Sequence, residues 1–441
     1  MRTLLRGGTV LTLGARTSNL VTGDVLIEDD RIVEVGAGLR ARDAEVVDAT
    51  DRVVLPGFVD AHRSAWRSLM KAVDDRPGTS HLATLGPRHE PDDVYAATLL
   101  GLLAALASGV TTVVDWADVH LDARYLEAAL QAHADAGVRT VFVPSRPAWA
   151  PDGDLDPDAW RTLATDLAGT PRPLTDLAFG SPALHPHDLE AVAAAWAQAR
   201  GLGLRVHAPA GTADAHRGAV AAVAGRGLLG ADITLVHATR LDEADLDALG
   251  SSDAALVLAP SYEMATGLGT PPLQALLDRR VRPGLGTGDE MPAPGDVFTA
   301  MRALQSLQHA AMFDLKLAGK AGLPDLLGTR EVIRFATIDG ARAAGLDAVT
   351  GSIEPGKQAD LVVLRTDLPN IHPVNDPIGA VVWGMDASNV DWVFVAGQAR
   401  VRAGELDADV PNVRRLATTA RQRLTDTGAE ALVRTAEGSG R

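Results

Sequence analysis

The stretch VLPGFVDAH, residues 54–62, marks the point at which the sequence changes character. Before it, residues 1–55 contain short apolar strands separated by glycine and aspartate turns, a pattern typical of a small β-rich unit. After it, short apolar strands alternate with helical stretches rich in alanine and leucine until about residue 345. This alternation predicts a parallel β/α barrel with right-handed crossovers, and a doubly wound open sheet is the alternative.

The barrel section contains eight predicted strands, at residues 53–59, 111–115, 139–143, 176–180, 205–208, 233–237, 255–258 and 282–286. Further strands are expected after it, at residues 351–352, 360–365, 380–383, 390–395 and 398–402. The β-rich units at the two chain ends are each too small to bury a core alone, so we expect them to combine. The predicted domains are a composite β-sandwich (1–55 and 350–410), a barrel (56–349) and a C-terminal helix with a tail (411–441).

Composition excludes several classes of function. The chain of 441 residues has no cysteine, so any metal site must use histidine and carboxylate ligands. Its formal net charge is -16 and its basic residues are scattered, which argues against nucleic acid as a partner. The N-terminus does not read as a signal peptide, and no apolar run reaches the roughly 18 residues of a membrane span. We therefore expect a cytoplasmic protein without a membrane partner.

Several motifs, in order along the chain, carry a resemblance to a known family. They are VLPGFVDAH (54–62), SGVTTVVDW (108–116), VH (206–207), LVH (235–237), GSIEPGKQAD (351–360) and VDWVFVAG (390–397). Together they closely resemble the amidohydrolase superfamily, in particular the branch that contains cytosine deaminase, guanine deaminase and triazine hydrolases. The resemblance covers about residues 4–405 and implies a distorted (β/α)8 TIM barrel with a small β-sandwich built from both chain ends.

The resemblance also implies a metal site from which this chain departs. Members of the family hold a divalent metal with a His-x-His pair on strand 1, a histidine on strand 5 and an aspartate on strand 8. Here strand 1 ends in His62-Arg63-Ser64, and Ala210 stands where deaminases of the family place a proton-carrying glutamate after His207. Gly288 stands at the position of the metal-binding aspartate, and Asp289 follows one residue late. A one-residue shift turns a side chain to the opposite face unless a bulge at the strand end restores it.

Candidate site residues are those at the carboxyl ends of the predicted strands, where barrel enzymes keep their active groups. The catalytic candidates are His237, His207, His62, Glu263 and Asp289. The candidates for substrate contact are Ser64, Trp66, Trp116, Tyr262 and His185. Ser64 as a nucleophile lacks an elbow motif. Strand alternation turns Arg63 away from His62, which predicts a salt bridge for it.

Three functions remain open at this point. The first is metal-independent acid-base chemistry on a small molecule, of the lyase, dehydratase, isomerase or cyclase type, with no cofactor expected. The second is a metal-dependent hydrolase or deaminase of non-peptide carbon–nitrogen bonds, with zinc or iron at His62, His207 and Asp289. The third is a catalytically dead protein that binds a small molecule. A large acidic barrel is also compatible with a homodimer.

Overall fold

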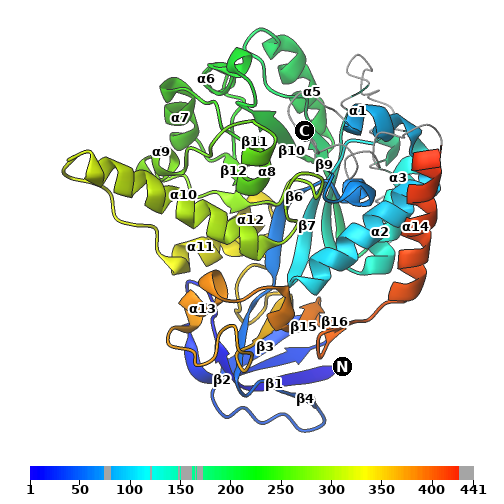
Figure 1. Ribbon diagram of the computed structural model, residues 1–441, viewed down its shortest axis with the longest axis vertical. Coiled ribbons are helices and arrows are strands. Elements are labelled where there is room, and N and C mark those ends of the chain that lie inside the picture. The colour runs from blue at the N-terminus through cyan, green and yellow to red at the C-terminus, as the bar shows by residue number, and fades with distance from the viewer. Residues whose placement is uncertain are drawn as a thin grey trace, which may run out of the picture.

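The computed structural model of the protein describes residues 1–73, 81–119, 122–147, 149, 161–163, 165 and 172–426. Eight parallel strands follow one another in sequence order around a barrel, which occupies the upper part of Figure 1. The barrel strands are β6 (Phe58–Arg63), β7 (Val110–Ala117), β8 (Arg139–Pro144), β9 (Thr175–Gly180), β10 (Arg205–Ala210), β11 (Ile233–His237), β12 (Ala255–Leu258) and β13 (Gly284–Leu285). A parallel bridge between Arg63 and Gly288 joins the last strand to the first. The predicted barrel is thereby confirmed.

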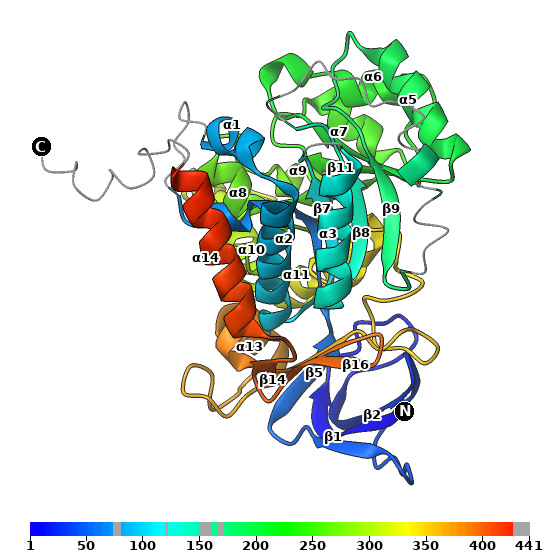
Figure 2. The ribbon, with the colours of Figure 1, turned by 90° about the vertical axis from the view of Figure 1, so that its right-hand side faces the viewer.

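Helices cover the outside of the barrel (Figures 1 and 2). They are α2 (Pro91–Ala107), α3 (Ala123–Ala136), α5 (Leu189–Gly201), α6 (Ala219–Gly225), α7 (Glu243–Gly250), α9 (Leu273–Asp278), α10 (Val297–Leu317), α11 (Thr329–Phe335) and α12 (Ile338–Ala343). The short helix α8 (Pro260–Ala265) follows β12 at the carboxyl end of the barrel. Shorter pieces are α1 (His81–Leu85) and the 3₁₀ turns η1 (Ala65–Met70), η2 (Gly86–Arg88), η3 (Asp214–His216) and η4 (Ala387–Asn389). Helix ends are capped locally, as at α10, where the Asp296 side chain accepts a hydrogen bond from the backbone N–H of Thr299.

Strands from both chain ends form one nine-stranded mixed sheet below the barrel (Figure 1). Its strands are β1 (Arg2–Val10), β2 (Leu20–Glu28), β3 (Arg31–Gly36), β4 (Glu45–Asp48), β5 (Arg52–Pro56), β14 (Leu361–Arg365), β15 (Val390–Val395), β16 (Gln398–Arg402) and β17 (Glu405–Leu406). The two chain ends meet where β5 pairs with β14, with Val54 opposite Val363. The second unit expected from both chain ends is therefore present as a single continuous sheet.

The stretch that begins the barrel differs from its prediction in one respect. Residues 53–59, expected as one strand, form the end of β5 and the start of β6, with Gly57 between them. A Cβ on Gly57 would lie 2.1 Å from Cγ2 of Thr111, so only glycine fits where the chain crosses from the lower sheet into the barrel. This glycine places His62 at the carboxyl end of the first barrel strand.

Two predicted strands after residue 350 are wrong. Residues 380–383 belong to helix α13 (Pro377–Trp383), because Asp376 caps its first turn and Pro377 occupies its first position. Residues 351–352 form a bend rather than a strand.

The C-terminal segment contains helix α14 (Val410–Asp426), which packs beside α2 on the outside of the barrel (Figure 2). Arg423 of α14 forms ion pairs with Glu90 and Asp93 at the start of α2. The expected tail, residues 427–441, lies outside the described residues. None of the helices within the described ranges is long and apolar enough to cross a membrane.

Candidate active site

Three histidines converge at the carboxyl end of the barrel, which we call the barrel mouth. His62 is the penultimate residue of β6, His207 lies in β10 and His237 ends β11. The rings of His62 and His237 meet edge to face with their centroids 5.1 Å apart. Burial, together with the neighbouring rings of His237 and His207, holds the pKa of His62 well below its ordinary value. Burial also lowers the pKa of His207 to about 3, so both imidazoles are neutral near pH 7.

His237 is oriented by a buried carboxylate. Its Nδ1 lies 3.0 Å from Oε1 of Glu263, which is fully buried near the start of α8. The same oxygen accepts a hydrogen bond of 2.9 Å from the backbone N–H of Ala259, so the carboxylate is held in place from two sides. A carboxylate on Nδ1 favours the tautomer with its proton on that nitrogen and leaves Nε2 as the basic atom.

The backbone at His237 is strained. His237 has a φ of 83° and the next residue, Ala238, a φ of 67°, so two successive non-glycine residues adopt left-handed conformations. Such strain costs of the order of 1–3 kcal/mol per residue and clusters at functional sites. The strained turn carries the His237 side chain to its contacts with Glu263, His62 and Tyr262.

Two aromatic rings flank the histidines. Trp116, from the end of β7, lies with its ring centroid 5.7 Å from that of His62. Tyr262, from α8, stacks on His237 with a centroid separation of 5.8 Å. Both are among the residues expected to contact substrate, and both adjoin the catalytic candidates. Their role as substrate contacts stays a prediction.

A buried arginine that the sequence analysis did not single out lies beside these histidines. Arg67, in η1, donates to Asp289 from Nη1 over 2.6 Å, and its Nη2 forms an ion pair with Asp118. Asp118 also accepts a hydrogen bond of 2.9 Å from the indole N–H of Trp66. The signal that could have found Arg67 is the presence of two carboxylates at strand ends, because buried carboxylates need a cation.

The end of strand 8 contains the bulge that could have brought Asp289 to the histidines. The backbone N–H groups of Thr287 and Gly288 both donate to the carbonyl oxygen of His62. Two residues after strand 8 therefore lie opposite one residue of strand 1, which is the pattern of a β-bulge. The carboxylate of Asp289 nevertheless contacts Arg67 and accepts a hydrogen bond from the backbone N–H of Met291. Asp289 is thus held by Arg67 rather than by a shared site with His62 and His207.

The fit of these residues to a metal ion is partial. Nδ1 of His62 and both ring nitrogens of His207 are buried and have no hydrogen-bond partner, as suits nitrogen atoms available to a metal. Within the described ranges, no three His, Asp or Glu side chains come together closely enough to hold an ion. The two imidazoles therefore offer unpartnered nitrogen atoms to a metal, whereas both carboxylate oxygens of Asp289 are engaged, by Arg67 and by the backbone N–H of Met291.

The other residues expected to contact substrate lie in different settings. Ser64 is the N-cap of η1, and its backbone N–H donates to the carbonyl oxygen of Gly288. Trp66 is buried against His89 and Trp149, which is a packing position. His185 lies in the loop after β9, where its ring centroid is 5.1 Å from that of His187 and 6.0 Å from that of His216.

Arg63 takes the structural role expected from strand alternation. It is fully buried and forms ion pairs of 3.1 Å with Asp60 and 2.9 Å with Glu290. It also donates to the carbonyl oxygens of Gly101 and Gly295. These contacts tie strand 1 to the segment after strand 8 on the side of β6 opposite His62.

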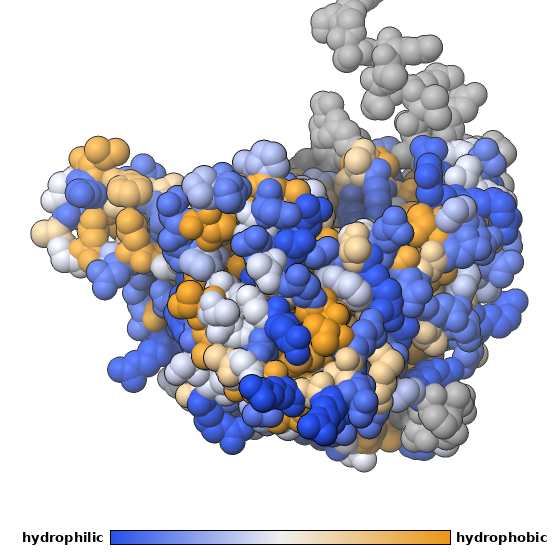
Figure 3. All heavy atoms as spheres, turned by 90° about the horizontal axis from the view of Figure 1, so that it is seen from below, coloured by the Kyte–Doolittle hydropathy of each residue, from blue (hydrophilic) through white to orange (hydrophobic). Residues whose placement is uncertain are grey.

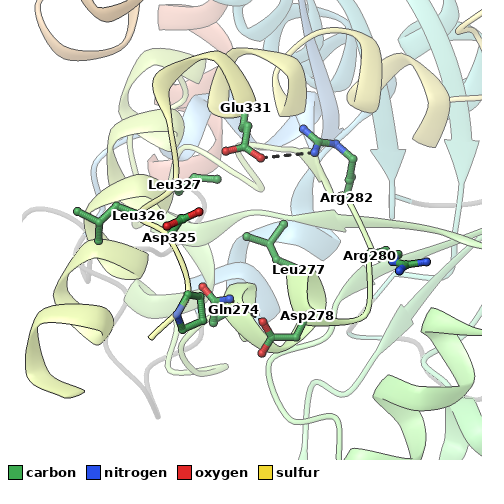
Figure 4. A pocket seen from close by; sticks show the side chains of 10 residues that line it. Gln274, Leu277, Asp278, Arg280, Arg282, Asp325, Leu326, Leu327 and Glu331 are labelled. Carbon is green, nitrogen blue, oxygen red and sulfur yellow. Dashed lines mark hydrogen bonds and ion pairs between the residues drawn. The ribbon is translucent and has the colours of Figure 1, made fainter. Parts of the chain in front are cut away.

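A surface hollow lies away from the barrel mouth. It has a volume of about 400 Å³ and lies between α9, α11 and the segment that leads into β13. An ion pair between Arg282 and Glu331 crosses it (Figure 4). Because Arg282 precedes β13, the hollow adjoins the amino end of that strand, where barrel residues serve stability rather than catalysis.

The chain is similar over nearly its whole length to curated deaminases. It is 28% identical to 5'-deoxyadenosine deaminase of Methanothermobacter thermautotrophicus, over 96% of this chain and 98% of the relative. It is 27% identical to 5-methylthioadenosine/S-adenosylhomocysteine deaminase of Pyrococcus furiosus, over 88% of this chain and 92% of the relative. These names contradict the expected lyase, dehydratase, isomerase or cyclase reaction and favour the alternative of carbon–nitrogen bond hydrolysis.

Solved structures share the fold. An adenosine deaminase from Xanthomonas campestris with bound zinc has a TM-score of 0.79 and 23% identity, covering 96% of this chain and 98% of that one. Atrazine chlorohydrolase from Arthrobacter aurescens complexed with zinc has a TM-score of 0.80 and 21% identity, covering 95% of this chain and 100% of that one. The zinc in both proteins contradicts the expectation that no cofactor is needed.

The family itself is shown by a separate comparison. The model of the amidohydrolase family matches residues 53–400, which include all eight barrel strands and β14 and β15 of the lower sheet. The match agrees with the order of motifs, with the barrel and with the deaminase relatives. The chain therefore belongs to the amidohydrolase family and is a hydrolase of that family.

Proposed function

We propose that this protein is a metal-dependent deaminase that hydrolyses a carbon–nitrogen bond of a small molecule. The observation that carries the proposal is the pair formed by His237 and Glu263, with 3.0 Å between Nδ1 and Oε1, at the carboxyl ends of neighbouring barrel strands. The ring of His237 lies beside that of His62, which supports one reaction centre that includes both histidines. The deaminase relatives support the reaction class.

The chain's own residues supply the proton transfers. With Glu263 holding the proton on Nδ1, Nε2 of His237 takes a proton from the attacking water as the water oxygen bonds to the carbon. The same imidazole then gives that proton to the departing nitrogen. The carbon–nitrogen bond breaks, the amine leaves as ammonia, and the carbon keeps the hydroxyl of the water. In this role His237 replaces the glutamate that is absent at Ala210.

His62 and His207 are the residues that would hold a metal ion, because their buried ring nitrogens include atoms without a hydrogen-bond partner. Zinc bound there would lower the pKa of a coordinated water toward neutrality. Burial supports this assignment, because it keeps both imidazoles neutral and neutral imidazole is the form that binds metals.

The substrate class follows from the walls of the site. Trp116 beside His62 and Tyr262 on His237 offer aromatic faces to a planar heterocycle. The names of the relatives specify adenine nucleosides that lack or replace the 5'-hydroxyl. We infer that an aminopurine nucleoside of this kind is the substrate.

The test is release of ammonia from 5'-deoxyadenosine, 5-methylthioadenosine and adenosine by the full chain, with zinc added and after removal of metal by a chelator. We expect release with at least one nucleoside, its loss with the chelator and its return with zinc. His237→Gln should abolish the activity, whereas His309→Gln on α10 should not, because His309 contacts Leu327, Phe313 and Trp383, which are not part of the candidate site. Absence of release from all three nucleosides, or activity that resists the chelator, would refute the proposal.

We propose in addition that the protein forms a homodimer through the projecting end of α10. The lobe at the left of Figure 3 is rich in apolar atoms, and the exposed apolar residues of this region include Phe313 and Leu317, 47% and 85% exposed. Exposed apolar patches commonly mark protein interfaces. Sedimentation should give a dimer for the native chain and a monomer for Leu317→Asp; a monomeric native chain would refute this proposal.

A further inference from the structure

A second hollow lies between the barrel and the lower sheet. It has a volume of about 560 Å³, and its walls are the loop after β1, helices α11 and α12, and residues 347–357, which lead toward β14. The backbone N–H of Val59, at the start of β6, donates to the carbonyl oxygen of Ala336, between α11 and α12. This wall therefore lies at the amino end of the barrel, opposite the barrel mouth. A volume of this size suits a small metabolite.

The walls of the hollow are held together by hydrogen bonds. The backbone N–H of Arg16, in the loop after β1, donates to Oε1 of Glu354 over 3.2 Å. Nη1 of Arg334, in α11, donates to the carbonyl oxygen of Leu13 over 3.3 Å. The loop from the lower sheet is thus attached to both other walls, so the hollow is formed by the fold.

Positive charge gathers around this hollow, although the chain as a whole has a formal net charge of -16. Four cationic side chains line it, against the two carboxylates of Asp347 and Glu354. The cations are Arg16, Arg334, Arg342 and Lys357. Such a local excess of two positive charges in a concave surface attracts anions.

The ammonium group of Lys357 is fixed in place without being neutralised by a close carboxylate. Its Nζ donates to the carbonyl oxygens of Asp347 over 2.5 Å and Thr350 over 3.0 Å, which are uncharged acceptors. Its separation from Glu354 is 3.9 Å. Oε2 of Glu354 instead accepts a hydrogen bond of 2.8 Å from the hydroxyl of Ser352. Lys357 therefore keeps attraction for a further anion.

The guanidinium groups are only loosely paired. The ion pair of Arg342 with Asp347 is 3.9 Å long and that of Arg334 with Asp339 is 3.6 Å, and both exceed a hydrogen bond. Arg16 hydrogen-bonds Glu354 through Nε over 3.4 Å, at the limit of such a bond. The Arg16 and Arg342 side chains are 80% and 63% exposed, so they can turn to a ligand. The planar fork of a guanidinium matches the oxygens of a phosphate group.

We propose that this hollow is a binding site for a small phosphate-bearing molecule that carries at least two negative charges. Arg16 from the lower sheet and Arg334 and Arg342 from the barrel helices donate to the phosphate oxygens, and Lys357 supplies a fixed positive charge. The ligand thereby connects the lower sheet to the barrel, and its binding stabilises the folded chain. The site is separate from the barrel mouth, so this inference does not rest on the proposed deamination.

The test is isothermal titration calorimetry of the full chain with pyrophosphate at constant ionic strength. We expect one saturable site in the native chain. Changing Arg16→Gln and Arg342→Gln together should weaken binding at least about tenfold, because two charged donors are lost. Asp347→Asn removes a lining carboxylate but keeps the backbone carbonyl that Lys357 uses, so it should tighten binding.

The matched control is Arg226→Gln, which removes an exposed ion pair with Glu190 on α5 and should leave binding unchanged. If the double variant fails to fold, the tighter binding expected for Asp347→Asn tests the site alone. No saturable binding up to about 10 mM pyrophosphate, native affinity in the double variant, or an equal loss in the control would overturn the inference. An affinity for Asp347→Asn no higher than that of the native chain would overturn it too.

Discussion

The ring of Tyr262 occupies the space that a side chain on Gly288 would need. A Cβ built on Gly288 would lie 2.4 Å from Cγ of Tyr262 and 2.6 Å from its Cβ, and Gly288 has a φ of +75°. Glycine at this position is thus required both by the backbone and by the neighbouring ring. The same ring stacks on His237, so packing at strand 8 and positioning at strand 6 depend on one side chain.

Gly288→Ala should therefore destabilise the fold. The left-handed backbone costs about 1–2 kcal/mol for a residue with a Cβ, and the clash adds about 1–3 kcal/mol. Chemical denaturation should show a loss of roughly 2–5 kcal/mol, part of which Tyr262→Ala should restore in the double variant. Gly201→Ala, with open space around its Cβ, is the matched control. A loss no larger than that of the control would contradict the packing described here.

Arg63 should be far more important for stability than an exposed arginine. Arg63→Met leaves Asp60 and Glu290 without their buried partner, which typically costs about 3–5 kcal/mol. Arg217→Met, which removes an exposed ion pair with Asp214, should change the free energy of unfolding by less than about 1 kcal/mol. Urea denaturation of the two variants compares them directly. Similar midpoints would mean that the Arg63 network does not contribute as its burial implies.

Glu263 should act through the orientation and charge of His237. Glu263→Gln keeps an oxygen that can accept from His237 and Ala259 but removes the negative charge that stabilises the imidazolium. We expect kcat for deamination to fall by about 100-fold or more with little change in KM. A rise in KM at constant kcat would instead indicate that Glu263 serves substrate binding.

The phenol of Tyr95 should lose its proton at a higher pH than an ordinary tyrosine does. Burial, and then a hydrogen bond of 2.8 Å from its hydroxyl to Asp135, raises the pKa of Tyr95 to about 12. Since the folded-state pKa lies above the unfolded value of about 10, this contribution to stability is present below pH of about 10 and is lost as the pH rises through about 12. The difference in phenolate absorbance between the native chain and Tyr95→Phe isolates this group. A midpoint near the ordinary value, or one that Asp135→Asn leaves unmoved, would refute the assignment.

Local sequence patterns were sufficient for most of the fold. The eight barrel strands lie at the predicted positions because apolar runs, turn residues and helical stretches are local signals. These local patterns gave a wrong prediction at residues 53–59, where one apolar run supplies strands to two sheets. They failed again at residues 380–383, where an apolar run preceded by Asp376 and Pro377 is helical. A short apolar run suits either element, so its surroundings decide.

For the candidate site too, some features follow from the sequence and others only from the tertiary structure. The sequence by itself determined that His62, His207 and His237 lie at the carboxyl end of one barrel, because parallel strands bring their ends together. Only the tertiary structure decided where the carboxylates go: Arg67 pairs with Asp118, 51 residues away, and with Asp289, 222 residues away. The physical reason is that charge pairing depends on distance in space, and the closure of the barrel, which no local pattern encodes, sets that distance.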